Sequence, residues 1–163
     1  MKKSKQIIYE SVYKCLMESF FKTAEISFNE SDLGDEINIG ICRNGDEMGY
    51  VILIPHNKIS SLYNEIADTD SYEMAEDVIG ELNSNKPIIE IADVDVSKKY
   101  RNKGVSKKLI EYVLEKYKDY QFYLRICPTD GVDEYTFANM FKRYGFIEID
   151  ILDNILKYIL KSF

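Results

Sequence analysis

The residues best suited to chemistry lie between positions 94 and 108. An extended Val94-Asp95-Val96 leads through a basic turn to Gly104, where a helical pattern begins. A helix N-terminus exposes unpaired backbone N–H groups with partial positive charge, and a glycine lets backbone approach a ligand closely. The pattern favours an anion site suited to phosphate; the alternative is a solvated basic turn that only caps the helix. The basic side chains of this turn are Lys98, Lys99, Arg101, Lys103, Lys107 and Lys108.

Other familiar catalytic patterns are missing from the sequence. The basic turn has neither the Gly-Lys-Ser/Thr ending of a Walker loop nor the Gly-x-Gly-x-x-Gly of a dinucleotide turn. Because His56 is the only histidine, the sequence argues against Ser-His-Asp catalysis and against a multi-histidine metal site. The cysteines Cys15, Cys42 and Cys127 lack metal-ligand spacing. We therefore predict no metal site, reduced thiols, and a structural or exposed His56 in a loop after Pro55.

The elements that position these residues follow from hydrophobic periodicity. The pattern predicts helices over 4–22, 58–82, 104–117 and 133–144. It predicts a hairpin over 37–54 with an Asn44-Gly45 turn, strands over 87–96 and 121–127, and a terminal strand pair at 146–152 and 155–160. This order indicates one α/β domain over 1–163, a mixed sheet flanked by helices.

Charge and hydropathy exclude several classes of protein. The net charge of -7 argues against nucleic-acid binding. The longest apolar run, 50–54, is far shorter than the ~20 residues of a membrane span, and we find no secretion signal, so we expect a cytoplasmic protein. The segment 59–85 is rich in acids and has no base. Such a run is usually a solvated face; the sharper interpretation is that it attracts a cationic substrate.

The basic turn resembles motif A of the GNAT acetyltransferases, approximately Leu-x-Val-x-Pro-x-Tyr-Arg-x-x-Gly-x-Gly/Ala. Lys98 stands where the family usually has proline, and Ser106 where it has glycine or alanine. Residues 141–146, Phe-Lys-Arg-Tyr-Gly-Phe, resemble the end of the family's motif B, a helix followed by Gly-Phe. The positions that fall on motif A are Val94, Val96, Tyr100, Arg101 and Gly104.

This resemblance implies a GNAT-like acyl-CoA N-acyltransferase fold with acetyl-CoA as co-substrate, bound in a gap between the motif A strand and the next strand. Residues 58–82 look like an insertion before the motif A strand. The resemblance implies that Val94 and Val96, which flank Asp95, pair with the pantetheine through main-chain groups. The Val96 N–H would polarise the thioester carbonyl. The pyrophosphate would be held by the backbone amides of Arg101, Asn102, Lys103, Gly104, Val105 and Ser106.

The resemblance also suggests a general base, Glu90, by its spacing from motif A. A free alkyl amine has a pKa of about 10.4, so it is protonated at neutral pH and must lose a proton before it attacks. On an unbroken strand Glu90 would share a face with Val94 and Val96, and Asp93 and Asp95 would point the other way; a bulge would change this. The alternative is that Glu90 is a surface strand residue.

The sequence departs from the family at Phe141, where many members carry a tyrosine as general acid. A phenyl ring donates no proton, but a thiolate is a fair leaving group because thiol pKa values are about 8.5. The tyrosines that could substitute are Tyr123, Tyr135 and Tyr144, each of which also suits a packing role.

The resemblance therefore implies an N-acetyltransferase in which a primary amine attacks acetyl-CoA directly in a ternary complex. The alternative is an acyl-CoA-binding protein of the same fold with little or no catalytic activity. We expect a small-molecule or peptide amine as acceptor, for which the acidic segment suggests a cationic compound. We expect no nucleic-acid or membrane partner, and either a monomer or a homodimer.

Overall fold

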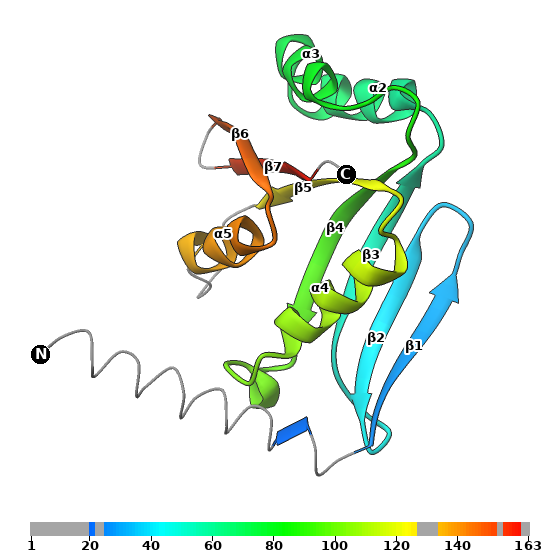
Figure 1. Cartoon of the computed structure of the whole chain (residues 1–163), viewed down its shortest axis with the longest axis vertical. Coiled ribbons are helices and arrows are strands. Elements are labelled where there is room, and N and C mark those ends of the chain that lie inside the picture. Colours follow the sequence, from blue (N-terminus) through cyan, green and yellow to red (C-terminus); the bar gives the residue numbers. More distant parts are fainter. Residues whose placement is uncertain (1–19, 22–24, 127–133, 153–154, 161–163) are drawn as a thin grey trace, which may run out of the picture.

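The computed structural model describes residues 20–21, 25–126, 134–152 and 155–160, and it confirms the mixed α/β class (Figure 1). The predicted helix over 4–22 lies outside the described residues except for 20–21, which are helical. The elements are, in order, β1 (Ile26–Asp32), β2 (Ile37–Arg43), β3 (Asp46–His56), α2 (Ile59–Thr69), α3 (Tyr72–Glu81), β4 (Ile88–Val96), a 3₁₀ turn η1 (Lys98–Tyr100), α4 (Val105–Lys116), β5 (Gln121–Ile126), α5 (Glu134–Arg143), β6 (Ile147–Leu152) and β7 (Ile155–Leu160).

One seven-stranded sheet runs through the described residues, in the order β1-β2-β3-β4-β5-β7-β6. All neighbours are antiparallel except β4 and β5, which are parallel and joined through α4. The predicted hairpin and terminal strand pair are confirmed as β2–β3 and β6–β7. The sequence analysis missed β1, an edge strand whose residues are mostly polar and exposed and whose pattern is therefore weak.

Strand β3 is longer than predicted. It continues through Pro55, which is paired with Ile89, to His56, which is paired with Ile88. The prediction that the strand ends at Pro55 and that His56 follows in a loop is therefore wrong. The pairing of β3 with β2 stops at Leu53, so Pro55 faces an open edge on that side, where a missing N–H costs no ladder hydrogen bond.

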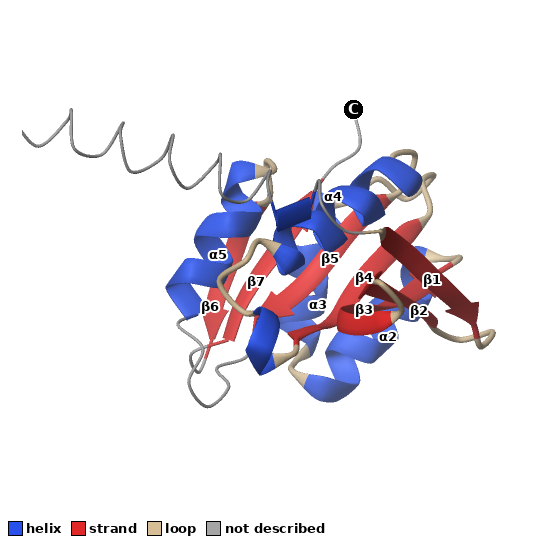
Figure 2. Ribbon diagram, turned by 90° about the horizontal axis from the view of Figure 1, so that it is seen from below, coloured by secondary structure: helices blue, strands red, loops and turns tan. Residues whose placement is uncertain are grey.

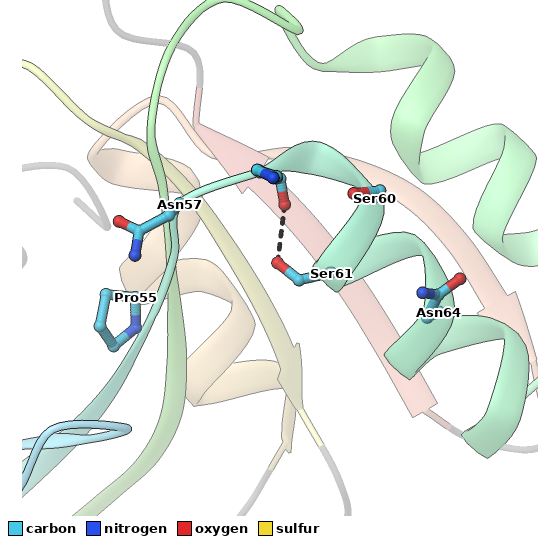
Figure 3. A pocket seen from close by; sticks show the side chains of 6 residues that line it. Pro55, Asn57, Ser60, Ser61 and Asn64 are labelled. Carbon is cyan, nitrogen blue, oxygen red and sulfur yellow. Dashed lines mark hydrogen bonds between the residues drawn. The ribbon is translucent and has the colours of Figure 1, made fainter.

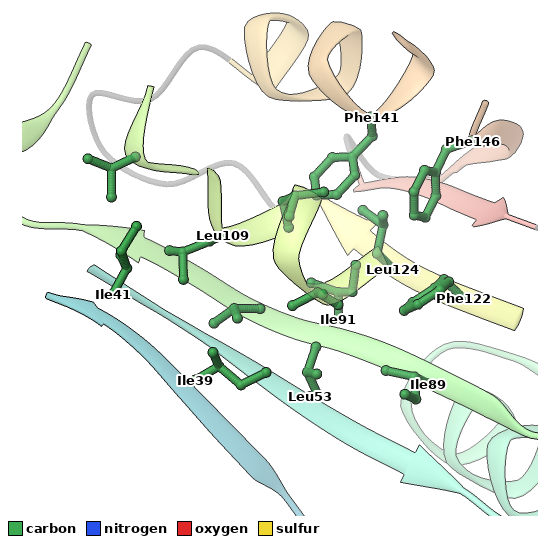
Figure 4. Close-up of a cluster of buried hydrophobic side chains, with 14 of the residues drawn as sticks. Ile39, Ile41, Leu53, Ile89, Ile91, Leu109, Phe122, Leu124, Phe141 and Phe146 are labelled. Atoms are coloured by element: carbon green, nitrogen blue, oxygen red, sulfur yellow. The ribbon is translucent and has the colours of Figure 1, made fainter. Parts of the chain in front are cut away.

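Two apolar cores lie on opposite faces of the sheet, as the turned view in Figure 2 shows for α4 and α2. The larger core lies beneath α4 and α5, where Leu109, Phe141 and Phe146 meet strand residues such as Ile39 and Ile91 (Figure 4). The smaller core is built from Leu62, Ile66, Met74, Ala75, Val78, Leu82, Ile88 and Tyr123.

The predicted helical insertion forms two helices, α2 and α3, rather than one. The chain turns at Asp70 and Ser71, and the Ser71 hydroxyl accepts a hydrogen bond from the backbone N–H of Met74, which caps α3. Both helices pack on the face of the sheet opposite α4. Within the described ranges, no helix is long and apolar enough to cross a membrane.

Candidate active site

Strands β4 and β5 separate halfway along β4. They are paired from Ile88 and Gln121 to Ile91 and Leu124, while β4 itself continues to Val96. Figure 1 shows the two strands diverging beyond this point. The rest of β4 is held on its other edge by β3 alone among the described strands. The sheet therefore opens beside Val94 and Val96, at the segment singled out from the sequence.

The backbone groups at this open edge can be assigned. The N–H of Ser97 donates to the carbonyl of Met48 over 2.9 Å, so residue 97 points toward β3. Backbone groups alternate between the two edges of an antiparallel strand, so those of Val96 and Val94 point to the open edge. The Nε of Arg101 donates to the Val96 carbonyl over 2.9 Å. The open edge thus presents main-chain donors and acceptors.

A bulge in β4 decides which way its side chains point. Ile52 is paired with Asp93 and Leu53 with Ile91, so Ala92 is the extra residue. Ile54, paired with Glu90, and Ile52 lie on one face of β3, so Glu90 and Asp93 share a face. Val94 and Val96 pack against the core beneath α4, on the opposite face. The expectation that Glu90 shares the face of Val94 and Val96 is therefore wrong, and the bulge is the reason.

Helix α4 begins where the sequence predicted, with a bare N-terminus. Gly104 is the N-cap and has a left-handed backbone (φ 72°), which a residue with a Cβ adopts only with strain. The first helical hydrogen bond runs from the N–H of Lys108 to the Gly104 carbonyl, so the helix leaves the amides of Val105, Ser106 and Lys107 unused. Among the described side chains, none caps this end.

Several basic side chains of the turn hold the turn itself in place. Lys99 Nζ and the Tyr100 hydroxyl each donate to Asp46 over 2.6 Å, which ties the turn to the start of β3. These two hydrogen bonds lower the pKa of Asp46, and the bond to Asp46 raises the pKa of Lys99. Lys103 Nζ donates to the Lys99 carbonyl over 2.8 Å, and Arg101 also contacts Asp95 at 3.4 Å. The site is therefore organised before any anion binds.

Glu90 lies on the other face of the sheet, in a buried cluster of charges. Its side chain is 3% exposed, so the alternative that it is a surface residue is excluded. One oxygen, Oε2, lies 3.4 Å from His56 Nε2, and the other, Oε1, lies 3.6 Å from the Arg125 guanidinium. Arg125 also lies within 3.9 Å of Glu65 and 3.5 Å of Asp70. Four elements, β3, α2, β4 and β5, contribute to this group.

The cluster changes the interpretation of the acidic segment. The Glu65 and Asp70 side chains lie against Arg125 and are only 33% and 9% exposed, which corrects the prediction that these two acids face solvent. Burial and then the nearby Glu90 charge raise the pKa of Glu65, although His56 and Arg125 act in the opposite direction. Burial alone would lower the pKa of Arg125, but Tyr123 and the surrounding carboxylates raise it. Arg125 therefore supplies the positive charge that compensates the negative charge of these carboxylates.

Three groups of the cluster have donor atoms at metal-ligand spacing. One donor atom from each of His56, Glu65 and Glu90 lies within 4.8 Å of the others. The guanidinium of Arg125 already approaches both carboxylates, at 3.9 and 3.6 Å. A cation bound among the three would have to share these carboxylates with a permanent positive charge. The arrangement fits an ion-pair network better than a metal centre.

Comparison with known proteins agrees with this geometry. The family model described as the acetyltransferase (GNAT) family matches residues 6–146. The chain belongs to the GNAT family. No curated protein matches the sequence.

Solved structures show the same GNAT fold at low sequence identity. NAA60 of Arabidopsis thaliana in complex with acetyl-CoA is 16% identical over 78% of this chain and 76% of that chain, with a TM-score of 0.53. NAA60 with a bisubstrate analogue is 14% identical over the same shares, with a TM-score of 0.54. The ribosomal-protein-S18-alanine N-acetyltransferase from Escherichia coli is 10% identical over 79% of this chain and 70% of that chain, with a TM-score of 0.52.

Of the candidate tyrosines that the structure describes, neither is a simple replacement for the tyrosine that many GNAT proteins use as general acid. Phe141 is fully buried and packs against Phe137 and Phe146. Tyr123 is also fully buried, on the opposite face, and its pKa is strongly raised by burial. Tyr144 is partly buried, and burial together with the Glu111 carboxylate raises its pKa to about 12, so it stays protonated at neutral pH. The side chain of Tyr135 lies outside the described residues.

Sequence reasoning found Glu90 but missed the residues that surround it. His56 was expected to be structural or exposed, and Glu65 was counted with the solvated acids. Arg125 had a signal that could have been used: it is a single charge within the apolar run Phe-Tyr-Leu-Arg-Ile of 122–126. A charge in such a strand requires a partner, and the acidic segment was the available source.

Proposed function

We propose that this GNAT protein transfers the acetyl group of acetyl-CoA to a primary amine by direct attack in a ternary complex. One observation carries the proposal: the open edge of β4 at Val94 and Val96 lies next to the bare N-terminus of α4. The first feature suits an extended amide-containing chain and the second suits phosphate. Pantetheine and pyrophosphate are linked in that order in acetyl-CoA.

Specific residues would hold each part of the cofactor. The main-chain groups of Val94 and Val96 would pair with the pantetheine amides, as an added strand does. Asp95 lies between them and contacts Arg101. The amides of Asn102, Lys103, Gly104, Val105 and Ser106 would bind the pyrophosphate at the start of α4. The Arg101 amide was expected to join them, but it donates to the Lys98 carbonyl over 3.4 Å. Lys99 and Tyr100 fix the turn through Asp46 and so preorganise these amides.

The chemistry then needs one base and one oxyanion donor. Glu90 would take the proton of the ammonium group, directly or through one water, and the free amine would attack the thioester carbonyl. The Val96 N–H would stabilise the oxygen that becomes negative, a contribution of about 2.7–4 kcal/mol. A C–N bond forms, the C–S bond breaks, and the departing thiolate takes up a proton. That proton comes from the nitrogen, which loses two protons in the reaction.

The acceptor is proposed as a small-molecule or peptide amine. The Escherichia coli neighbour is a ribosomal-protein-S18-alanine N-acetyltransferase, which supports a peptide amine. Five acids other than Glu65 and Asp70 are exposed on the α2–α3 surface, and they would favour a cationic acceptor. We further propose a cytoplasmic location and a monomeric or homodimeric state. These exposed acids are Asp68, Glu73, Glu76, Asp77 and Glu81.

The first test is thermal stability with and without acetyl-CoA. At a concentration about a hundredfold above the dissociation constant, specific binding should add roughly 2.7 kcal/mol. Arg101→Glu should remove this stabilisation. The matched control is Lys118→Glu, the same charge reversal at an exposed residue beyond the far end of α4. No stabilisation of the folded wild-type protein would refute the proposal.

The second test follows release of the CoA thiol with three amines: a short peptide with a free N-terminus, Nα-acetyl-lysine amide and spermidine. Glu90→Gln should lower kcat by about 10²–10⁴-fold, whereas Glu115→Gln, at an exposed acid near the end of α4, should leave it unchanged. Stabilisation by acetyl-CoA without thiol release from any amine would instead support an acyl-CoA-binding protein of the same fold.

A further inference from the structure

The proposed reaction leaves a proton on a buried group. An ammonium and acetyl-CoA become an amide, the CoA thiol and one free proton: the nitrogen loses two protons and the thiolate keeps one. If Glu90 is the base, the second proton rests on its carboxylate after each turnover. That carboxylate is only 3% exposed, so it does not exchange freely with bulk water. A route from Glu90 to solvent is needed.

A chain of hydrogen-bonding groups leads from Glu90 to the surface. His56 Nε2 lies 3.4 Å from Glu90 Oε2, and His56 Nδ1 lies 3.3 Å from Ser61 Oγ. Ser61 is exposed and lines a surface hollow of about 390 Å³ at the start of α2 (Figure 3). The imidazole therefore lies between the carboxylate and the residue that lines this surface hollow.

The hydrogen bonds of Ser61 set the direction of transfer. Its hydroxyl donates to the Lys58 carbonyl over 2.7 Å, the bond drawn in Figure 3. A serine has one hydroxyl proton, so Ser61 can only accept from His56. The neutral ring therefore carries its proton on Nδ1 and presents the lone pair of Nε2 to Glu90. This tautomer can take a proton from Glu90 on Nε2. The imidazolium then gives its Nδ1 proton to Ser61 Oγ while Ser61 turns its own hydroxyl proton away from the Lys58 carbonyl and gives it to water in the hollow.

The surrounding charges favour this transfer. Arg125 approaches Glu90 Oε1, which leaves Oε2 directed at the ring. Glu65 Oε2 lies 3.8 Å from Nε2 and would stabilise the imidazolium that forms. Helix α2 therefore supplies both Ser61 and Glu65 to the route. The titratable and charged groups that face His56 and Glu90 are Glu65 and Asp70 from the α2 region and Tyr123 and Arg125 from β5.

We propose that His56 and Ser61 form a proton relay that carries the proton of each turnover from Glu90 to solvent beneath α2. The relay rests on the proposed acetyltransferase function. His56 acts through Glu90 and does not touch the substrate. On this view the inserted helices α2 and α3 do more than cover an apolar face, because they complete the exit route of the proton.

The test compares variants under saturating acetyl-CoA and the best of the three amines named above. His56→Ala should lower kcat about 10–100-fold with little change in acetyl-CoA affinity. Added imidazole should restore part of the rate in proportion to its concentration, because it can fill the cavity and carry the proton. Leu62→Ala removes a buried side chain of the neighbouring helix α2 and should show no rescue by imidazole. A merely structural histidine would not produce a rate that depends on imidazole.

A serine pair supplies a matched control. Ser61→Ala should lower kcat severalfold and make the rate depend on buffer concentration, while Ser60→Ala, in the same hollow, should do neither. An active wild type with an equally active His56→Ala, or with an impaired His56→Ala that imidazole does not restore, overturns the relay alone. A wild type that binds acetyl-CoA but acetylates none of the three amines overturns the proposed function, and the relay falls with it.

Discussion

Two charged regions lie on either side of the same strand, β4, and they are built differently. The basic turn after Val96 is continuous in sequence, and its charged side chains are exposed: Lys99 is 60% exposed and Arg101 41%. The cluster around Glu90 is assembled from four elements, and its His56 and Glu90 side chains are 4% and 3% exposed. The charged groups of the turn lie at the surface, whereas those of the cluster are buried and are compensated by groups of opposite charge.

This difference determines what each region contributes. In water, an ion pair is worth little, and the turn depends on backbone amides and on the dipole of α4 to attract an anion. In the interior, each charge needs a partner, because an unpaired buried charge is costly. We therefore expect substitutions in the turn to affect ligand binding more than stability, and substitutions in the cluster to affect stability as well as catalysis.

The largest expected effect is on stability, from Arg125→Met. This change leaves the carboxylates of Glu65, Asp70 and Glu90 without their shared cation, and we expect a loss of about 3 kcal/mol of unfolding free energy at neutral pH. The loss should shrink in acid, where the carboxylates are protonated. Urea denaturation at two pH values measures both quantities.

The matched change in the turn is Lys99→Met, which breaks the exposed pair with Asp46. We expect little change in unfolding free energy, together with weaker acetyl-CoA binding because the turn loses an anchor. If Lys99→Met were as destabilising as Arg125→Met, the contrast between the two regions would be wrong.

The second prediction concerns the packing that supports the open edge of β4. A Cβ built at Gly49 overlaps the Asp95 carbonyl oxygen and lies 3.1 Å from the Val96 Cα. Gly49→Ala should therefore displace the end of β4, cost about 1–3 kcal/mol in stability, and weaken acetyl-CoA binding. Calorimetric titration with acetyl-CoA and urea denaturation test the two effects.

Gly80→Ala is the control for this change, because a Cβ at Gly80 meets nothing within 4 Å and the residue lies in α3. Alanine is the better helix former, so stability should rise by up to about 1 kcal/mol while binding stays unchanged. If Gly49→Ala and Gly80→Ala weakened acetyl-CoA binding equally, the effect could not be assigned to the contact between residue 49 and the end of β4.

The same contrast explains how much of the site could be predicted from the sequence. The turn was found because Arg101 and Gly104 lie within a short segment whose local structure is fixed by strand and helix periodicity. The β4 bulge was not predictable, because Ala92 carries no signal that it is an extra residue; its effect on Glu90 appears only through the register with Ile52 and Leu53. His56 and Arg125 reach Glu90 through tertiary packing, which no local pattern encodes.

The third prediction concerns an unsatisfied group in the buried region. The Tyr123 hydroxyl is buried and has no hydrogen-bond partner among the described atoms. An unpaired buried hydroxyl costs free energy, so Tyr123→Phe should stabilise the protein by about 1 kcal/mol. Tyr100→Phe, which loses a hydrogen bond to Asp46 in the exposed turn, should not be stabilising. A destabilised Tyr123→Phe in thermal denaturation would show that this hydroxyl has a partner such as a bound water.

The smallest expected effect is the pH dependence that Glu65 adds to stability. Its pKa is raised above the ordinary value of 4.5, so the folded protein binds more protons than the unfolded chain in the interval above that value. Stability should therefore fall as the pH rises through this interval. This decrease in unfolding free energy should be less than about 1 kcal/mol, because the carboxylate is one-third exposed. Glu65→Gln should remove it.

Urea denaturation of Glu65→Gln and Glu73→Gln, across a pH series that begins below the ordinary glutamate pKa, separates this effect from surface charge. Glu73 is exposed on α3, so its replacement should shift the whole curve slightly and leave its slope unchanged. If both variants kept the wild-type slope, Glu65 would titrate like a solvated acid, and the buried cluster would end at Asp70 and Glu90. A flatter curve for Glu65→Gln alone places α2 within the electrostatic environment of Glu90, the same environment that the proton relay requires.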